Sequence, residues 1–153
     1  LNRRGFISGA ETLLRHVRRF GGCAHVLFID IDGLKQVNDE LGHEAGDDLI
    51  RRAADAVRET VRDADVVGRW GGDEIVVLAA AAWGDPSLMA RIADAGDRLE
   101  VSLSVGCATS YAAEDRTLDS LISEADADMY LRRSFARLPG LRPDLGIPHQ
   151  SGG

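Results

Sequence analysis

Apolar and polar residues follow two different periods along the chain, which indicates both helices and strands. Apolar residues at positions i, i+3, i+4 and i+7 lie on one face of a helix, whereas short apolar runs and strict alternation are typical of strands. The pattern predicts helices over residues 7–20, 34–41, 45–61, 88–95 and 118–135. It predicts strands over residues 23–31, 65–69, 74–80 and 99–108. In the last strand, the residues expected to share one buried face are Val101, Leu103, Val105 and Cys107.

The order of these elements predicts an α+β fold, in which helices flank the faces of a mostly antiparallel sheet. A chain of 153 residues is long enough for one domain with a sizeable core. We expect that domain to span residues 1–137. Residues 138–153 contain proline and glycine and have little periodicity, which predicts a flexible C-terminal tail.

A glycine-rich turn joins the two strands in the middle of the chain. Gly71 and Gly72 stand between the apolar runs, and adjacent glycines predict a two-residue hairpin turn because both can take positive φ angles. Asp73 and Glu74 follow directly. Bare backbone at the two glycines lets a bulky ligand approach, and a neighbouring carboxylate can hold a cation, so this turn suits a metal-bound nucleotide. A surface hairpin with two solvated acids is the alternative interpretation.

A second group of acids ends the strand predicted over residues 23–31. Asp30 and Asp32 are two positions apart, so their side chains should share one face of the strand while Ile31 faces the core. If the strands that carry Asp30 and Asp73 are neighbours, both carboxylates meet at one edge of the sheet. One or two carboxylates plus substrate phosphates are a sufficient ligand set for Mg²⁺. The alternative interpretation is that Asp30 and Asp32 cap the next helix.

The charge and composition of the chain narrow the classes of partner. A formal net charge of −7 argues against a nucleic-acid polymer or an anionic membrane surface, but is compatible with a single nucleotide. Cys23 and Cys107 lie in apolar runs, which favours buried free thiols over a disulfide or a zinc site. No apolar run reaches membrane-spanning length, and no signal peptide is evident. Because the chain begins at Leu1, we expect a cytoplasmic piece of a longer protein, whether or not that parent is anchored in a membrane.

Five short motifs follow one another in an order that is typical of one family. They are DIDGLKQVND at 30–39, GHEAGD at 42–47, RWGGDEI at 69–75, SVG at 104–106 and ADADMY at 125–130. The chain resembles the GGDEF domains, the diguanylate cyclases, and NRRGF at 2–6 is similar to the family's opening motif. The resemblance covers residues 1–137, and the order of the motifs makes it far more specific than Gly-Gly-Asp-Glu alone.

The resemblance implies that two GTP molecules are condensed to cyclic di-GMP with release of two pyrophosphates. Each copy of the family's domain holds one GTP, so two copies must meet as a homodimer. The 3′-hydroxyl of each nucleotide then attacks the α-phosphate of the other. In such in-line phosphoryl transfer, positioning and charge neutralisation supply most of the catalysis.

The resemblance also implies a role for each acid at the sheet edge. Asp30 and Asp73 correspond to the family's metal-binding carboxylates, with the Ile31 carbonyl oxygen as a further ligand of Mg²⁺ or Mn²⁺. Glu74 matches the second acidic position, where it either binds a second metal ion or helps to deprotonate the attacking hydroxyl. Lys35 matches a phosphate-binding cation at a helix N-terminus, where the helix dipole also favours anions. The expected catalytic residues are therefore Glu74, Asp73 and Lys35.

Other matching positions are expected to bind the substrate. Asn38 and Asp47 match the family's guanine-binding residues, and an amide with a carboxylate separates guanine from adenine through the N1–H and N2–H₂ donors. His43 lies in the same loop and is expected to line the base pocket, with a capping or spacer role as the alternative. Arg133 and Arg137 match phosphate-binding cations on the last helix, and a solvated basic face is the alternative there.

A second site is expected just before the hairpin. Arg62 and Asp65 match the Arg-x-x-Asp pattern through which many family members bind their product and are inhibited by it. Arginine can bond guanine O6 and N7 in bidentate fashion, and aspartate can accept from N1 and N2. A plain salt bridge between Arg62 and Asp65 is the alternative interpretation.

The chain departs from the family pattern at several positions. Ile75 and Leu34 stand where phenylalanine is usual, and Arg133 replaces the usual lysine. Ala136 and Leu138 replace glycine and asparagine beside the last phosphate-binding arginine. None of these changes removes a metal or guanine ligand, which favours an active cyclase over a degenerate domain that binds GTP or cyclic di-GMP and regulates a partner. A purely structural dimerisation module would not need acids at strand ends.

Overall fold

The structure is a computed structural model that describes residues 1–82, 85 and 87–138. Within these residues the elements are α1 (Arg3–Phe20), β1 (Cys23–Ile31), α2 (Leu34–Leu41), α3 (His43–Thr60), β2 (Val66–Arg69), β3 (Glu74–Ala81), α4 (Leu88–Arg98), β4 (Leu103–Tyr111) and α5 (Leu118–Ala136). The strands form one sheet in the order β2-β3-β1-β4, and each pair of neighbours is antiparallel. The predicted α+β architecture is therefore confirmed.

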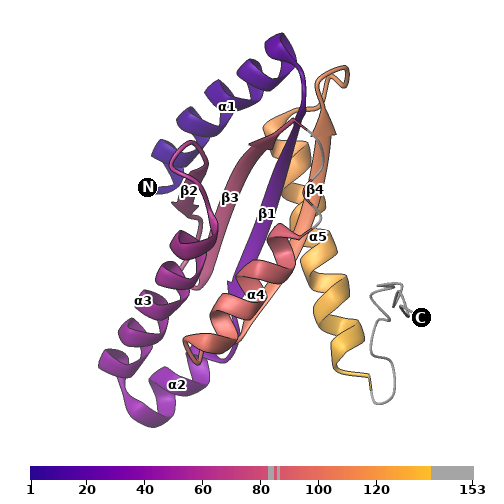
Figure 1. Cartoon of the computed structure of the whole chain (residues 1–153). Helices are drawn as coiled ribbons and strands as arrows, with labels where there is room; N and C mark the ends of the chain where they lie inside the picture. Colours follow the sequence, from indigo (N-terminus) through magenta and orange to yellow (C-terminus); the bar gives the residue numbers. More distant parts are fainter. Residues whose placement is uncertain (83–84, 86, 139–153) are drawn as a thin grey trace, which may run out of the picture.

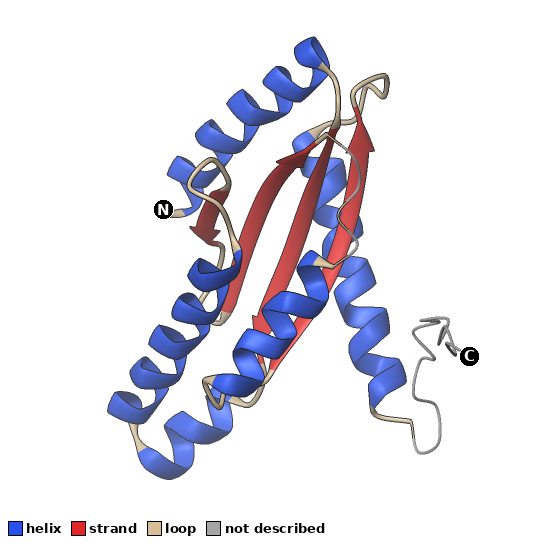
Figure 2. Ribbon diagram, in the orientation of Figure 1, coloured by secondary structure: helices blue, strands red, loops and turns tan. Residues whose placement is uncertain are grey.

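Helices cover both faces of the sheet. Figure 1 shows α1 and α5 on one face and α3 and α4 on the other, and Figure 2 shows the strands enclosed between these helical layers. Alternate residues of β1 contribute to two cores, because successive side chains of a strand point to opposite faces. Val26 and Phe28 pack with α1 and α5, whereas Leu27 and Ile29 pack with α3 and α4. The end of β1 is thereby held from both sides.

Two helices begin earlier than the apolar pattern predicts. α1 begins at Arg3 because the Asn2 side chain accepts a hydrogen bond from the Gly5 N–H at 2.8 Å and caps the helix. α3 begins at His43 because Gly42 takes a φ angle of +88° and joins it directly to α2. The two helices that carry Asn38 and Asp47 are therefore separated by a single glycine.

The predicted end of α4 and the predicted start of β4 are wrong. α4 continues to Arg98 and β4 begins at Leu103, whereas the strand was expected from residue 99. Glu100 turns the chain with a φ angle of +56°. The Arg52 side chain of α3 donates hydrogen bonds to the carbonyl oxygens of Leu99 and Glu100 at 3.2 and 2.8 Å. This support comes from a distant part of the sequence, so the local pattern does not show it.

The turn between β2 and β3 is longer than the predicted two-residue turn. Arg69 pairs with Ile75, and four residues lie between the strands. Neither Gly71 nor Gly72 has a positive φ angle, so the predicted conformation is wrong. The Arg69 side chain instead donates to the carbonyl oxygens of Gly71 and Gly72 at 3.1 and 2.7 Å and closes the loop. A Cβ atom at position 71 would lie 2.4 Å from Glu74 Oε2, so a side chain there would require the Glu74 carboxylate to turn away.

Both cysteines are free, as expected, but Cys107 is only half-buried, whereas Cys23 is buried. Cys107 packs in the core under α3 and α4 together with the other residues predicted on its face of the strand, which are Val101, Leu103 and Val105. Almost all of the tail expected over residues 138–153 lies outside the described residues. Of the helices described, none has both the length and the apolar character that crossing a lipid bilayer requires.

Candidate active site

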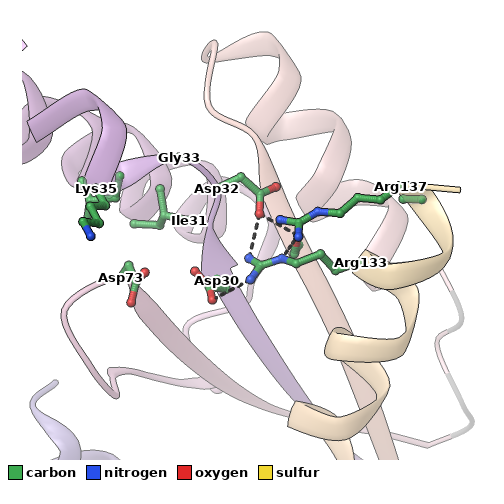
Figure 3. Close-up of a pocket in the computed structure, with 11 residues that line it drawn as sticks. Asp30, Ile31, Asp32, Gly33, Lys35, Asp73, Arg133 and Arg137 are labelled. Carbon is green, nitrogen blue, oxygen red and sulfur yellow. Dashed lines mark hydrogen bonds and ion pairs between the residues drawn. The ribbon is translucent and has the colours of Figure 1, made fainter. Parts of the chain in front are cut away.

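The ends of β1 and β3 bring Asp30 and Asp73 to one edge of the sheet. Asp30 pairs with Glu74 across these antiparallel strands, and the Ile31 N–H donates to the Asp73 carbonyl oxygen at 2.9 Å. Figure 3 shows the carboxylates of Asp30 and Asp73 on facing sides of the same opening. Residues that are 43 positions apart in the chain are therefore neighbours here.

A cavity of about 420 Å³ opens beside these acids. Its lining comes from the end of β1, the start of α2, the β2–β3 loop and the end of α5, and includes Asp30, Ile31, Lys35, Asp73, Arg133 and Arg137. Figure 3 shows Lys35 on one side of the opening and the two arginines on the other. Carboxylates beside three cationic side chains suit a ligand that brings both a metal ion and several phosphate groups.

Arg133 is hydrogen-bonded to the acids on the α5 side of the cavity. Its Nη1 donates to Asp30 Oδ2 at 3.2 Å, and its Nη2 donates to Asp32 Oδ1 at 2.7 Å. Its Nε donates to Ser104 Oγ at 3.0 Å. Asp32 also accepts hydrogen bonds from the hydroxyl groups of Ser102 and Ser104, at 2.8 and 2.7 Å. One connected group of side chains thus joins α5, the start of β4 and the end of β1.

Burial and crowding make negative charge unfavourable at this sheet edge. Burial raises the pKa of the Asp30 carboxyl, while the hydrogen bond from Arg133 acts in the opposite direction. Burial also raises the pKa of Glu74, and the neighbouring charges of Asp73 and Asp30 add to that effect. A bound cation would relieve the repulsion among these carboxylates.

The oxygen atoms at the cavity match the preferences of a hard divalent ion. Asp30, Asp73 and Ile31 all line it, and Mg²⁺ can complete such a set with water and phosphate oxygens. Across the residues that the structure describes, no group of three or more histidine, cysteine or acidic side chains is arranged to hold a metal ion. The two carboxylates and the carbonyl group leave coordination positions that phosphate oxygens and water can fill.

Asn38, His43 and Asp47 lie on α2 and α3, outside the lining of this cavity. His43 and Asp47 are exposed, whereas Asn38 is half-buried. The Asn38 amide rests against Gly46, because a Cβ atom at position 46 would lie only 1.7 Å from Asn38 Oδ1. Gly46 therefore leaves the room that this amide occupies.

A second cavity, of about 200 Å³, lies between α3 and the β2–β3 hairpin. Gly72 and Glu74 line it together with Ile50 of α3, and Ile31 lines both cavities. The structure thus places Glu74 beside Asp30 in the sheet but on the wall of the second cavity. Gly71 lines neither of the two cavities.

The chain matches one protein family over almost all of its described length. The family described as "Diguanylate cyclase, GGDEF domain" matches residues 1–136. The chain belongs to the GGDEF family. The resemblance of its ordered motifs is therefore confirmed, and the antiparallel sheet with its flanking helices is the fold of a GGDEF domain.

Relatives of this GGDEF domain include named diguanylate cyclases. Diguanylate cyclase DosC of Escherichia coli (strain K12) is 32% identical over 149 residues, which cover 90% of this chain and 32% of DosC. The crystal structure of the GGDEF domain of PA1120 (YfiN or TpbB) from Pseudomonas aeruginosa has a TM-score of 0.75 and 33% identity, covering 88% of this chain and 90% of that one. A microbial GGDEF domain studied for its interaction with cyclic di-GMP has a TM-score of 0.74 and 29% identity, covering 90% and 89%. The chain spans about a third of the length of DosC.

In this GGDEF domain, Arg62 and Asp65 precede β2, whereas the β2–β3 loop with Gly71 and Gly72 follows it. Asp65 Oδ2 accepts a hydrogen bond from the Arg62 backbone N–H at 2.8 Å, and the Asp65 N–H donates to the Arg62 carbonyl oxygen at 3.0 Å. The turn is thus held through the backbone of Arg62, and its side chain is exposed.

Three polar residues of the site have no role predicted from the motifs, namely Asp32, Ser102 and Ser104. The strand period carries a partial signal, because Asp32 shares a face with Asp30 and Ser104 pairs with Asp30 across β1 and β4. What the sequence does not show is that α5 brings Arg133 onto the same face. That depends on how closely α5 packs on the sheet.

Proposed function

We propose that this GGDEF domain is a diguanylate cyclase, in which two copies together condense two GTP molecules to cyclic di-GMP and two pyrophosphates. The main observation behind the proposal is the convergence of Asp30 and Asp73 at an opening that Lys35, Arg133 and Arg137 also line. This arrangement suits a metal-bound triphosphate. The name of DosC, a diguanylate cyclase, supports the same activity.

In the proposed arrangement, Asp30, Asp73 and the Ile31 carbonyl oxygen hold Mg²⁺ or Mn²⁺. Such an ion, when bound, neutralises the charge that develops on the phosphate oxygens. Lys35 and Arg137 bind the triphosphate from opposite sides of the cavity, so that the α-phosphate is held in line with the incoming hydroxyl. The residues of this chain thus mainly orient the nucleotide.

Glu74 is proposed to take the proton of the attacking 3′-hydroxyl. A general base works best when its pKa lies near the operating pH, and burial raises the pKa of Glu74 in that direction. Gly71 and Gly72 are proposed to let the nucleotide lie close to the backbone of the β2–β3 loop. The 3′-hydroxyl that loses its proton to Glu74 belongs to the nucleotide bound by one copy of the domain. This hydroxyl attacks the α-phosphate of the nucleotide bound by the other copy.

The guanine base is proposed to lie against α2 and α3, where Asn38 and Asp47 pair with its polar edge and His43 lines the pocket. Adenine would leave the polar groups of Asn38 and Asp47 without partners in the pocket, which would disfavour ATP. The selectivity for GTP therefore depends on the orientation of Asn38.

A direct test is to incubate the purified protein with GTP and Mg²⁺ and to separate the nucleotides by chromatography. The proposal predicts cyclic di-GMP and pyrophosphate, with a specific activity that rises with protein concentration because two copies must meet. GTP that binds but is not consumed, even at high protein concentration, would contradict the proposal.

That outcome would favour a second function, a regulatory module that binds GTP or cyclic di-GMP without turnover. Two observations support this alternative. Ala136 and Leu138 depart from the family pattern next to Arg137. In addition, the relative studied for its interaction with cyclic di-GMP is 29% identical to this chain.

Substituting Gly46 with alanine should weaken GTP binding without destabilising the domain. The new methyl group would occupy the place of the Asn38 amide, which can turn away because it is the end of a flexible side chain. Alanine in a helix is favoured over glycine by about 1 kcal/mol, so stability should be kept or increased. Loss of the Asn38 contact should raise the Kd for GTP about tenfold, as titration calorimetry with a non-hydrolysable GTP analogue would measure. An unchanged Kd would argue against Asn38 as a guanine-binding residue.

Substituting Arg62 with alanine should relieve inhibition by the product. The exposed Arg62 guanidinium is proposed to bond a guanine of cyclic di-GMP, and losing a charged hydrogen bond of this kind should raise the half-inhibitory concentration about tenfold. Initial rates at increasing cyclic di-GMP would measure it. Arg51→Ala is the matched control, because Arg51 is an exposed arginine of α3 that pairs with Asp48. Equal inhibition curves for the two variants would count against the second site.

A further inference from the structure

The guanidinium of Arg133 already balances the charge of the Asp30 carboxylate. Arg133 Nη1 lies 3.2 Å from Asp30 Oδ2, and the two side chains are only 23% and 15% exposed. Solvent and salt screen such a partly buried pair much less than a surface pair. Arg133 therefore contacts one carboxylate oxygen of Asp30, which the proposed function assigns as a metal ligand.

Asp32 holds Arg133 in this position. Its Oδ1 accepts from Arg133 Nη2 and from the Ser104 hydroxyl, and its Oδ2 accepts from the Ser102 hydroxyl. Its backbone N–H donates to the Ser102 carbonyl oxygen at 3.0 Å. Both carboxylate oxygens of Asp32 are thus engaged with the protein, so Asp32 is an anchor for Arg133 and leaves the cation to Asp30 and Asp73.

Ser104 fixes the third side of the guanidinium. Its hydroxyl accepts from Arg133 Nε at 3.0 Å and donates to Asp32. Arg133 therefore makes a directed contact through each of its three nitrogen atoms, and Figure 3 shows the guanidinium between Asp30 and Asp32. The planar guanidinium of Arg133, held at three nitrogen atoms, is more rigidly placed than a lysine ammonium group would be.

The ion pair between Arg133 and Asp30 affects the binding of a lone divalent ion differently from the binding of a divalent ion with a triphosphate. An ion that binds Asp30 by itself would face the like charge of Arg133 at short range. A triphosphate removes that conflict, because its oxygens can accept hydrogen bonds from the guanidinium in place of the single contact that it gives up at Asp30. Arg133 can therefore exchange Asp30 for phosphate oxygens only when the ion and the phosphates bind together.

We propose that Arg133 couples metal binding to triphosphate binding: held by Asp32 and Ser104, it competes with a lone metal ion for Asp30 and turns to the phosphates when a metal-bound nucleotide enters. The inference rests on the proposed function, because it takes Asp30 as a metal ligand. Arg133 acts on the metal site through Asp30, and Asp32 and Ser104 are positioning residues. Coupling of this kind is reciprocal, so the metal also raises the affinity for the nucleotide.

The test is a Mn²⁺ titration of the protein without nucleotide, followed by the electron paramagnetic resonance signal of free Mn²⁺. Arg133→Gln removes the competing charge and should lower the Kd for Mn²⁺ at least about fivefold, the lower end of typical coupling between sites. Adding a non-hydrolysable GTP analogue should remove or reverse the difference from the unsubstituted protein, because Arg133 then binds phosphate.

Two further variants separate the inference from simpler explanations. Arg132→Gln removes the same charge one residue away, where Arg132 pairs with Asp128, and should leave the Kd for Mn²⁺ within about twofold of the unsubstituted value. Ser104→Ala changes no charge but loosens Arg133, so it should tighten Mn²⁺ binding in the same direction as Arg133→Gln. Ser104→Ala also keeps the test valid if Arg133→Gln fails to fold.

Unchanged Mn²⁺ affinity in both Arg133→Gln and Ser104→Ala would overturn the inference and leave Arg133 as a structural link between α5 and the sheet. Equal tightening in Arg133→Gln and Arg132→Gln would overturn it as well, because net charge alone would then explain the effect. An active cyclase with unchanged Mn²⁺ affinity in these variants would refute only this inference. A protein that binds Mn²⁺ as expected but forms no cyclic di-GMP would refute only the proposed function.

Discussion

Replacing Asp73 with alanine should abolish the formation of cyclic di-GMP and leave the domain folded. Asp73 is one of the two carboxylates proposed to hold the metal ion, and charge stabilisation by a metal ion is worth several kcal/mol, so the rate should fall about 1,000-fold or more. The fold should survive because Asp73 contributes to the sheet through its backbone, whose carbonyl oxygen accepts from the Ile31 N–H at 2.9 Å.

Cyclic di-GMP formed from GTP and Mg²⁺ would measure this effect, and far-ultraviolet circular dichroism would check the fold. Asp55→Ala is the matched control, because this substitution removes the same charge from the surface of the domain. Asp55 is an exposed acid of α3 that pairs with Arg58. The control should keep its activity within about twofold, as surface pairs contribute little. Activity of Asp73→Ala close to that of Asp55→Ala would refute the metal assignment.

A methyl group at Gly106 should destabilise the domain strongly. α5 lies so close to β4 at this point that a Cβ atom would be 2.1 Å from the Met129 nitrogen and 2.2 Å from the Ala125 carbonyl oxygen. Both are backbone atoms of a helix, which cannot turn aside as a side chain can. Overpacking of a core typically costs 1–3 kcal/mol, and we expect about 3 kcal/mol and a fall of about 10 °C in Tm for Gly106→Ala.

Differential scanning calorimetry would measure the change in Tm. Gly72→Ala is the control for stability, because a Cβ atom at position 72 meets nothing within 4 Å and Gly72 has no positive φ angle. A Tm for Gly106→Ala within about 2 °C of that control would show that α5 can move away at little cost. In that case the position of Arg133 relative to Asp30 would also be loosely held.

Much of the fold follows from the order of apolar segments. β1 is almost continuously buried, which is the signature of a central strand, and the sheet indeed places it between β3 and β4. The spacing of Asp30 and Asp32 also places both on the face that α5 covers, where Arg133 contacts them. Period and order are local properties, so a single sequence displays them.

The parts that could not be predicted depend on contacts between distant residues. Arg52 of α3 supports the turn at Glu100, and without that support the apolar residues after Leu99 look like the start of a strand. The conformation of Gly71 and Gly72 depends on the Arg69 side chain, which closes the loop through their carbonyl oxygens. Propensity describes what a segment prefers alone, whereas these side chains decide what it does in the domain.

The candidate site also has a part that the sequence predicts and a part that depends on contacts between distant residues. Strand order brings Asp30 and Asp73 together, which the positions of the acids at strand ends indicate in advance. The ion pair between Arg133 and Asp30 depends instead on the approach of α5 to β4 at Gly106, a distance that no sequence pattern states. The same holds for the Asn38 amide, whose place is set by the missing side chain of Gly46 on the next helix.

The most direct measurement is a crystal structure of the protein grown with Mn²⁺ and a non-hydrolysable GTP analogue, with anomalous scattering used to locate the metal. We expect an anomalous peak between the Asp30 and Asp73 carboxylates, the triphosphate in the cavity beside Lys35 and Arg137, and the base against α2 and α3. A metal peak away from both carboxylates, or a nucleotide bound elsewhere on the domain, would contradict the proposed metal and nucleotide site.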